Sequence, residues 1–176
     1  PVNPVFHGNL GNCNLYSGRW DAAIASYQTA LRLSPDYIGA HYKIGLALLF
    51  KNENVDGART ALAEFDLEVG DEEYRVKGLA LAMHAQGRHE EYQAKLGELI
   101  ERWGSQWPSE VAQVYAYADN ADAAFEWLNK AVTQNEDGLN EQFLQPFYTS
   151  LHSDPRWALF LDRKSTRLNS SHMSIS

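Results

Sequence analysis

The sequence has little positive charge, a single cysteine and no long apolar run. Lys and Arg number 15 against 23 Asp and Glu, which gives a formal net charge of −8. Nucleic-acid binding needs a basic stripe, so this composition argues against it. The single cysteine, Cys13, excludes an internal disulfide and a multi-cysteine metal site. The longest apolar run, residues 44–50, is much shorter than the about 20 residues of a membrane-spanning helix.

The last fifteen residues differ in composition from the rest of the chain. From Asp162 onward the segment holds five serines, three basic residues and no aromatic residue. Codons for 162–176 match a widely used sequencing-library adapter in register, so we predict that this segment is not native. Its deletion should leave the melting temperature unchanged, and the net charge without it is about −10. Residue 1 is Pro rather than Met, and we expect a longer natural protein with a helix that continues past Leu161.

What is present is a helical pattern that is punctuated by glycine and proline. In residues 17–37, Ala23, Tyr27 and Ala30 recur at helical spacing and form one apolar stripe. Gly18 precedes this helix, at a turn where a permissive backbone is useful. Pro35 ends the helix because proline disfavours helical geometry in the residue before it.

The same pattern recurs along the chain. The small residue of the stripe is found at Ala23 and Ala58, is replaced by Tyr92, and returns at Ala124, with spacings of 35, 34 and 32 residues. A period near 34 residues indicates stacked helix pairs. Gly87 marks the turn of the third pair, and Asp119, a residue type that tolerates unusual backbone angles, marks that of the fourth.

The first copy resembles a tetratricopeptide repeat. That repeat has Leu-Gly in its first helix, small and aromatic residues in its second, and a closing proline. The matching residues are Leu10, Gly11, Ala23, Tyr27, Ala30 and Pro35, whereas His7 and Asn14 stand where the repeat has Trp and Tyr.

The resemblance implies an all-α fold, a right-handed superhelical solenoid of about four helix pairs with a short C-terminal capping helix. We expect the pairs at about 4–35, 38–67, 73–103 and 106–134, and a truncated cap at 135–161. An end repeat has no neighbour to bury its apolar face, so the apolar residues Phe143, Leu144, Phe147 and Leu151 should cover it. The last helix should begin at Pro155, with Ser153 or Asp154 as its N-cap.

The C-terminal half is similar to the repeat region of a group of bacterial regulatory proteins. In that group the repeats follow a winged-helix DNA-binding domain, an adenylate or guanylate cyclase domain, or a serine/threonine kinase domain. The resemblance depends on residues 112–117, 124–128, 138–139 and 153–156. It implies a module located in the bacterial cytoplasm, or in the periplasm if a transmembrane helix precedes the repeats.

The sequence gives no pattern of a catalytic, cofactor or metal site. His89-Glu90-Glu91 resembles the start of a zinc-protease motif, but Gln93 stands where the second histidine is needed, so a solvated helix start is the better interpretation. No phosphate-binding glycine loop is present. Arg156 could bind an anion at a helix N-terminus, although pairing with Asp154 or Glu141 is better supported. We therefore expect no enzymatic activity, no cofactor and no metal in this chain.

The remaining candidate is a binding surface. In repeats of this kind the first helix of each pair lines a concave groove that holds a peptide or a partner helix. The repeat phase places these residues in the groove: Asn12, Leu15, Tyr16, Tyr42, Leu46, Leu49, Tyr74, Lys77, Leu81, His84, Gln113 and Tyr117. Tyrosine suits recognition because it combines an apolar ring with a polar tip.

Three hypotheses of function follow from these observations. The first is a non-catalytic interaction or sensor module of a bacterial signalling or transcription regulator, which binds a peptide, a partner protein or its own upstream effector domain. The second is a structural scaffold or self-association module that forms a homo-oligomer. The third is an enzyme built on a helical solenoid, which would require turnover that depends on His84 or His89.

Overall fold

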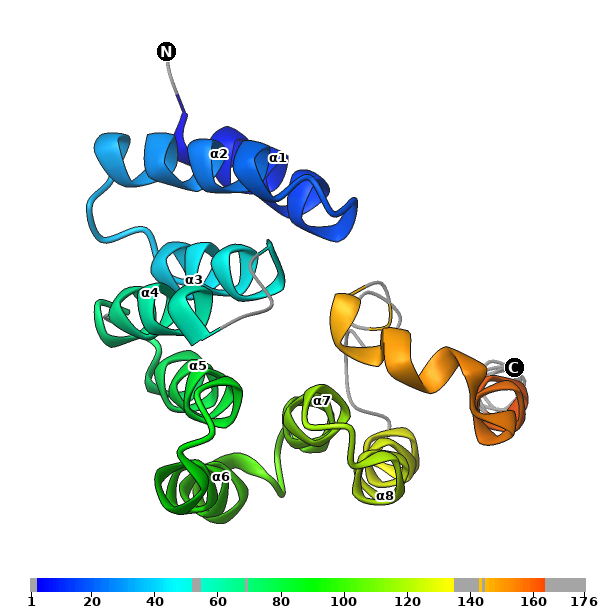
Figure 1. Ribbon diagram of the computed structural model, residues 1–176. Coiled ribbons are helices and arrows are strands. Elements are labelled where there is room, and N and C mark those ends of the chain that lie inside the picture. Colours follow the sequence, from blue (N-terminus) through cyan, green and yellow to red (C-terminus); the bar gives the residue numbers. More distant parts are fainter. Residues whose placement is uncertain (1–2, 52–54, 69, 135–142, 144, 164–176) are drawn as a thin grey trace. The chain divides into compact units, whose positions relative to one another are not determined.

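The computed structural model describes residues 3–51, 55–68, 70–134, 143 and 145–163 (Figure 1). Every regular element in these residues is a helix. The chain divides into two compact units, Pro1–Ser105 and Gln106–Ser176. Each unit is described by itself.

The first unit consists of consecutive helix pairs, which confirms the predicted all-α fold. Each helix packs on the next along the chain; in addition, α1 contacts α3 and α3 contacts α5. The first helices of the pairs therefore form one layer. The six helices are α1 (Pro4–Tyr16), α2 (Trp20–Leu33), α3 (Ala40–Lys51), α4 (Val55–Asp66), α5 (Glu72–Ala85) and α6 (His89–Trp103).

Glycine and aromatic residues set the close approach of these helices. A Cβ atom at Gly11 would lie 2.6 Å from the ring of Tyr27 on α2, which is closer than packed atoms approach. A Cβ at Gly45 on α3 or at Gly78 on α5 would collide with the ring of Phe65 on α4. Tyr27 and Phe65 are both buried. The expectation that Gly11 permits a close helix approach is confirmed, and the same arrangement recurs in the second pair.

Three turns between paired helices share one backbone geometry. Gly18, Gly87 and Asp119 all have a positive φ, of 69°, 70° and 54°. At the first of these turns the N–H of Arg19 donates to the carbonyl of Asn14 at 2.9 Å, and corresponding bonds form at the other two. This is the Schellman motif, which favours glycine at the left-handed position. All three turns lie where the sequence predicted them, and Asp119 occupies the left-handed position without being glycine.

The periodic stripe of the second helices faces the interior. Ala23, Ala58, Tyr92 and Ala124 are all buried. The near-34-residue spacing therefore marks equivalent packing positions in four helix pairs.

The second unit contains one helix pair and its cover. It comprises α7 (Pro108–Tyr117), α8 (Ala121–Thr133), the 3₁₀ helix η1 (Pro146–Ser153) and a helix at 155–163. The hydroxyl of Tyr148 on η1 donates to the carbonyl of Ser109 on α7 at 3.2 Å. Phe147 and Leu151 are buried, as a covering segment requires, while Leu144 lies outside the described residues.

The helix at 155–163 begins as the sequence predicts. The carboxylate of Asp154 accepts a hydrogen bond from the backbone N–H of Arg156 at 2.9 Å, which makes Asp154 its N-cap. The helix continues through Asp162 and Arg163, the first two residues of the segment that we predict to be non-native.

Candidate interaction surface

The predicted groove residues divide into a buried and a partly exposed set. Buried are Leu15, Tyr42, Leu46, Leu49, Lys77, Leu81 and Gln113. Partly exposed are Asn12, Tyr16, Tyr74, His84 and Tyr117. A first helix has neighbours on several sides, so much of its apolar surface packs within the unit. Gln113 and Tyr117 belong to the second unit, and the other ten residues belong to the first.

Aromatic stacking joins α3 and α5. The rings of Tyr42 and Tyr74 lie 4.7 Å apart with an interplanar angle of 10°. The ammonium of the buried Lys77 lies 5.2 Å from the centre of the Tyr42 ring, within cation–π range. The ring of Phe65 on α4 also belongs to this cluster, with its centre 5.7 Å from that of the Tyr42 ring. Three predicted groove residues from two helices thus form one cluster, and Tyr74 is its partly exposed member.

Glu68 is a structural support of this cluster that the sequence analysis missed. Its side chain is buried and accepts hydrogen bonds from the backbone N–H groups of Gly39 at 2.8 Å and Tyr42 at 3.0 Å. Unpaired N–H groups and the helix dipole favour a carboxylate at the start of α3. Because Glu68 follows α4 and lies 29 residues from Gly39, no local pattern could have shown this contact.

Hydrogen bonds also hold the polar part of α1. The side-chain carbonyl of Asn12 accepts from the hydroxyl of Tyr27 at 2.7 Å. Burial raises the pKa of the Tyr27 hydroxyl well above its usual range, so it remains a donor. In the next pair, His41 Nδ1 of α3 lies 2.9 Å from a carboxylate oxygen of Glu64 on α4. The first helices are therefore tied to their second helices by polar as well as apolar contacts.

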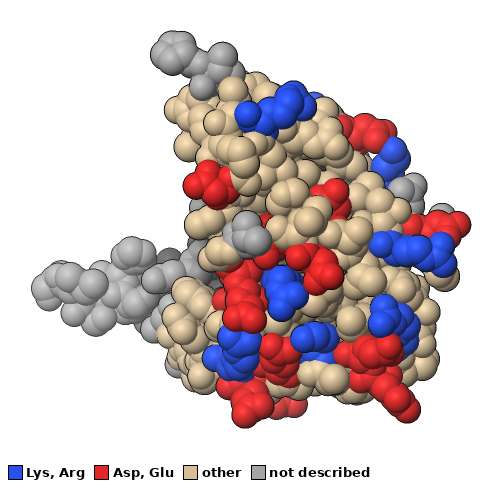
Figure 2. All heavy atoms as spheres, turned by 90° about the vertical axis from the view of Figure 1, so that its left-hand side faces the viewer, with Lys and Arg blue, Asp and Glu red and all other residues tan. Residues whose placement is uncertain are grey.

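Charged side chains of both signs are intermingled on one face of the molecule (Figure 2). Arg102 of α6 bonds to Glu72 of α5 and to Glu98 of its own helix, both at 2.9 Å. Lys95 lies 2.7 Å from Glu98, and its hydrogen bond, with that of Arg102, lowers the pKa of the Glu98 carboxyl. On the face shown, positive and negative side chains lie side by side without a large patch of one sign (Figure 2).

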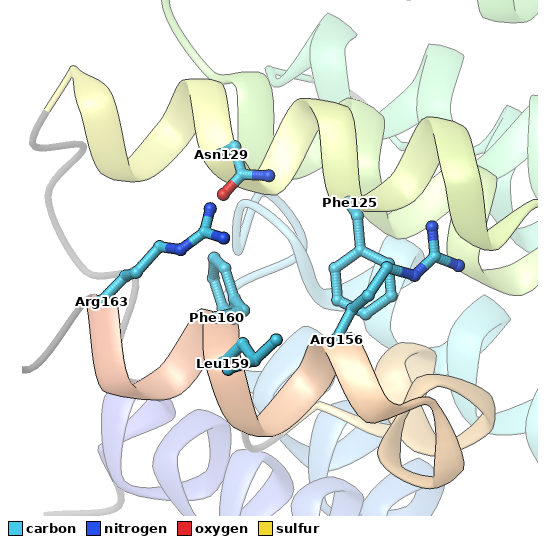
Figure 3. Close-up of a pocket in the computed structure, with 6 residues that line it drawn as sticks. All are labelled: Phe125, Asn129, Arg156, Leu159, Phe160 and Arg163. Atoms are coloured by element: carbon cyan, nitrogen blue, oxygen red, sulfur yellow. The ribbon is translucent and has the colours of Figure 1, made fainter.

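A small pocket lies between α8 and the helix at 155–163 (Figure 3). Its volume of about 90 Å³ is far below the roughly 300–1,000 Å³ of typical ligand pockets. The guanidinium of Arg156 bonds to Asp122 at 2.6 Å and to Asp154 at 2.7 Å, and it lies 4.6 Å from the centre of the Phe125 ring. These bonds raise the pKa of Arg156 above its usual range. The predicted pairing with Asp154 is confirmed, and Glu141 lies outside the described residues.

The histidine and metal motifs have structural explanations. His89 begins α6, with Glu90 and Glu91 in the first turn, as expected for a helix start. Among the described residues, no group of three or more His, Cys, Asp or Glu side chains is placed to hold a metal ion. Within the same residues, no helix combines the length and apolar character that crossing a membrane requires.

Part of the first unit matches a known family. A sequence-family model described as a TPR repeat matches residues 11–52. The match begins at Gly11, the glycine under Tyr27, and extends over α2 and α3. No curated protein sequence matches the chain significantly.

Proposed function

Because the chain is a tetratricopeptide-repeat protein, a class that generally mediates protein–protein contacts without catalysis, we propose that its first unit binds a peptide or helix of a protein partner. The binding surface is the layer formed by α1, α3 and α5. The observation that carries this proposal is the position of partly exposed polar and aromatic side chains on this layer. They are Asn12 and Tyr16 on α1 and Tyr74 and His84 on α5.

The chemistry of this layer suits an extended peptide or an amphipathic helix. The ring edge of Tyr74 offers apolar area and a hydroxyl at little cost in conformational entropy, since stacking on Tyr42 already holds it. Asn12 is held by Tyr27, so its remaining donors have a defined direction. The fold remains intact if a partner contacts only these outer atoms, because the buried groove residues stay within the core.

Binding measurements with single substitutions test this surface. Peptides selected against the immobilised full chain should bind Tyr16→Ala and Tyr74→Ala at least tenfold more weakly, about 1.4 kcal/mol. Tyr74→Phe keeps the stacking on Tyr42 and separates loss of the hydroxyl from loss of the ring.

Exposed positions on the second helices provide matched controls. Gln28→Ala on α2 and Gln93→Ala on α6 should leave the affinity within twofold. Equal weakening at all four positions, or selection of no binding peptide, would contradict the proposed surface.

We also propose that this module belongs to a bacterial signalling or transcription regulator and binds its own effector domain or a separate partner. The support is the resemblance of residues 112–117, 124–128, 138–139 and 153–156 to the repeat region of such regulators. Sequencing the source DNA in both directions tests this proposal. An in-frame winged-helix, cyclase or kinase domain upstream is expected, whereas a start codon directly before Pro1 would contradict it.

A further inference from the structure

A row of apolar side chains lies exposed on α1. Phe6 is 64% exposed, Leu10 is 42% exposed, and the thiol-bearing Cys13 is also exposed. These residues are four and three positions apart, so they share one side of the helix. Scattered apolar residues on a surface are ordinary, but a continuous row marks a face that binds another chain segment. We call Phe6, Leu10 and Cys13 the outward face of α1.

The internal repeat shows what happens to the same positions in the next two pairs. Gly11 and Gly45 are equivalent glycines, each packed under an aromatic ring of the second helix of its own pair. Ala80 takes this position in the third pair, because it precedes the turn at Gly87 as Gly11 precedes the turn at Gly18. One residue before this position stand Leu10, at 42% exposed, Ile44, at 2%, and Leu79, at 6%.

The residue two positions further on is likewise exposed only on α1 among these three helices. Cys13 is exposed, whereas Ala47 and Ala82 are completely buried. Ala40, the equivalent of Phe6 on α3, is also completely buried. Exposure of the outward face is thus specific to α1.

The equivalent positions on α3 and α5 are buried because a second helix precedes each of these helices and packs on it. α2 packs on α3, and α4 packs on α5. In the first of these contacts Trp20 of α2 stacks on Phe50 of α3 at 5.9 Å, and Asp21 pairs with Lys51. Among the described residues, α1 follows no such helix.

We propose that the outward face of α1 is a docking site for an amphipathic α-helix of the same kind as α2. This helix lies on α1 as α2 lies on α3, and it places an aromatic residue near Tyr16, which is 34 positions before Phe50. The outward face itself shares no residue with the layer of α1, α3 and α5 that we propose to bind a partner, and the two sites meet at Tyr16.

An extended chain tests the site with the repeat itself as the probe. A second copy of residues 3–36, with its cysteine changed to alanine, is placed directly before Asn3, which restores the 34-residue spacing of Gly11 and Gly45. The alkylation rate of the remaining Cys13 by iodoacetamide should fall at least tenfold, and the melting temperature should rise. Far-ultraviolet circular dichroism checks that the added residues are helical.

A matched control changes Ile24→Lys and Leu31→Lys in the added copy alone. Both residues share the side of α2 that carries Trp20 and are only partly exposed there. Cys13 in this control should react at the rate of the unextended chain. Protection that survives the lysines, an unchanged rate in the extended chain, or an extension that adds no helix would overturn the proposal.

Measurements on the unextended chain test whether a second copy of the chain, rather than a helix of another segment, covers the outward face of α1. Its Cys13 should alkylate at the same rate at all protein concentrations, and sedimentation should give a monomer. Protection that increases with protein concentration, together with a dimer mass and a Cys13–Cys13 disulfide on mild oxidation, would overturn the helix proposal in favour of self-association.

Discussion

The first and second units differ in whether the outer face of a helix is covered by another segment. α1 of the first unit leaves Phe6 and Leu10 exposed. In the second unit, η1 and the helix at 155–163 cover α7 and α8, and Trp157 packs at 5.8 Å from Tyr148 and at 6.5 Å from Phe125. Both outer faces are apolar in sequence, so the comparison shows that exposure depends on whether a covering segment is present and not on the helix itself.

Removing the centre of the cover should have the largest effect. Tyr148 is completely buried, with its ring 5.8 Å from those of Phe143 and Trp157. Tyr148→Ala should lower the free energy of unfolding by about 3–5 kcal/mol through lost burial and a cavity. Urea denaturation followed by tryptophan fluorescence measures this change.

Tyr148→Phe is the matched control, because it keeps the ring and removes the hydroxyl that donates to the Ser109 carbonyl, and it should cost about 1 kcal/mol. Equal effects of the two substitutions would mean that the hydroxyl, and not the ring, holds the cover.

The turns allow a second comparison between the units. Asp119→Gly should stabilise the chain by about 0.5–1 kcal/mol, since glycine adopts the left-handed conformation without strain. Gly87→Ala should destabilise it by about 1 kcal/mol. A Cβ at Gly87 meets nothing within 4 Å, so this substitution measures backbone strain alone. Thermal denaturation checks both, and a destabilising Asp119→Gly would show that the aspartate side chain outweighs the strain.

A charged and an uncharged N-cap, Asp154 and Asn3, should respond differently to pH. The guanidinium and backbone N–H of Arg156 lower the pKa of the Asp154 carboxyl below its ordinary 3.8. The group therefore adds stability above its unfolded pKa and loses it as pH falls through the lowered folded pKa. Asp154→Asn should be less stable than the natural chain at neutral pH, and this difference should vanish in strong acid.

Asn3, the uncharged cap of α1, provides the reference. It accepts a hydrogen bond from the N–H of Val5 at 2.9 Å. Asn3→Ala should cost about 1 kcal/mol at every pH, because an amide does not titrate. A pH-independent penalty for Asp154→Asn in the same denaturation series would mean that its charge has no role.

The smallest effect is expected at the uncovered face. Phe6→Ser replaces an exposed ring and should change the free energy of unfolding by no more than about 0.5 kcal/mol. Urea denaturation at low protein concentration measures it. A loss of several kcal/mol would show that Phe6 is already covered in the free chain, and would remove the contrast between the two units.

Features that depend on neighbouring residues could be predicted from the sequence. The turn at Asp119 and the cap at Asp154 lie where the residue types placed them, because backbone bonds over a few positions decide both. The groove depends on more distant contacts. Leu46 and Leu81 were placed in it by the repeat phase and are buried, since a helix period alone cannot distinguish a groove position from a contact with a third helix.

The sequence by itself determined the helices, their turns and the spacing of the small residues, because propensity, capping and glycine geometry act locally. Only the tertiary structure decided that Glu68 holds the start of α3 and that Arg156 pairs with Asp122. It also decided that Leu10 is exposed whereas its equivalent Ile44 is buried. The physical reason is that burial and pairing depend on which distant segment packs on a helix face, and the local sequence does not specify that segment.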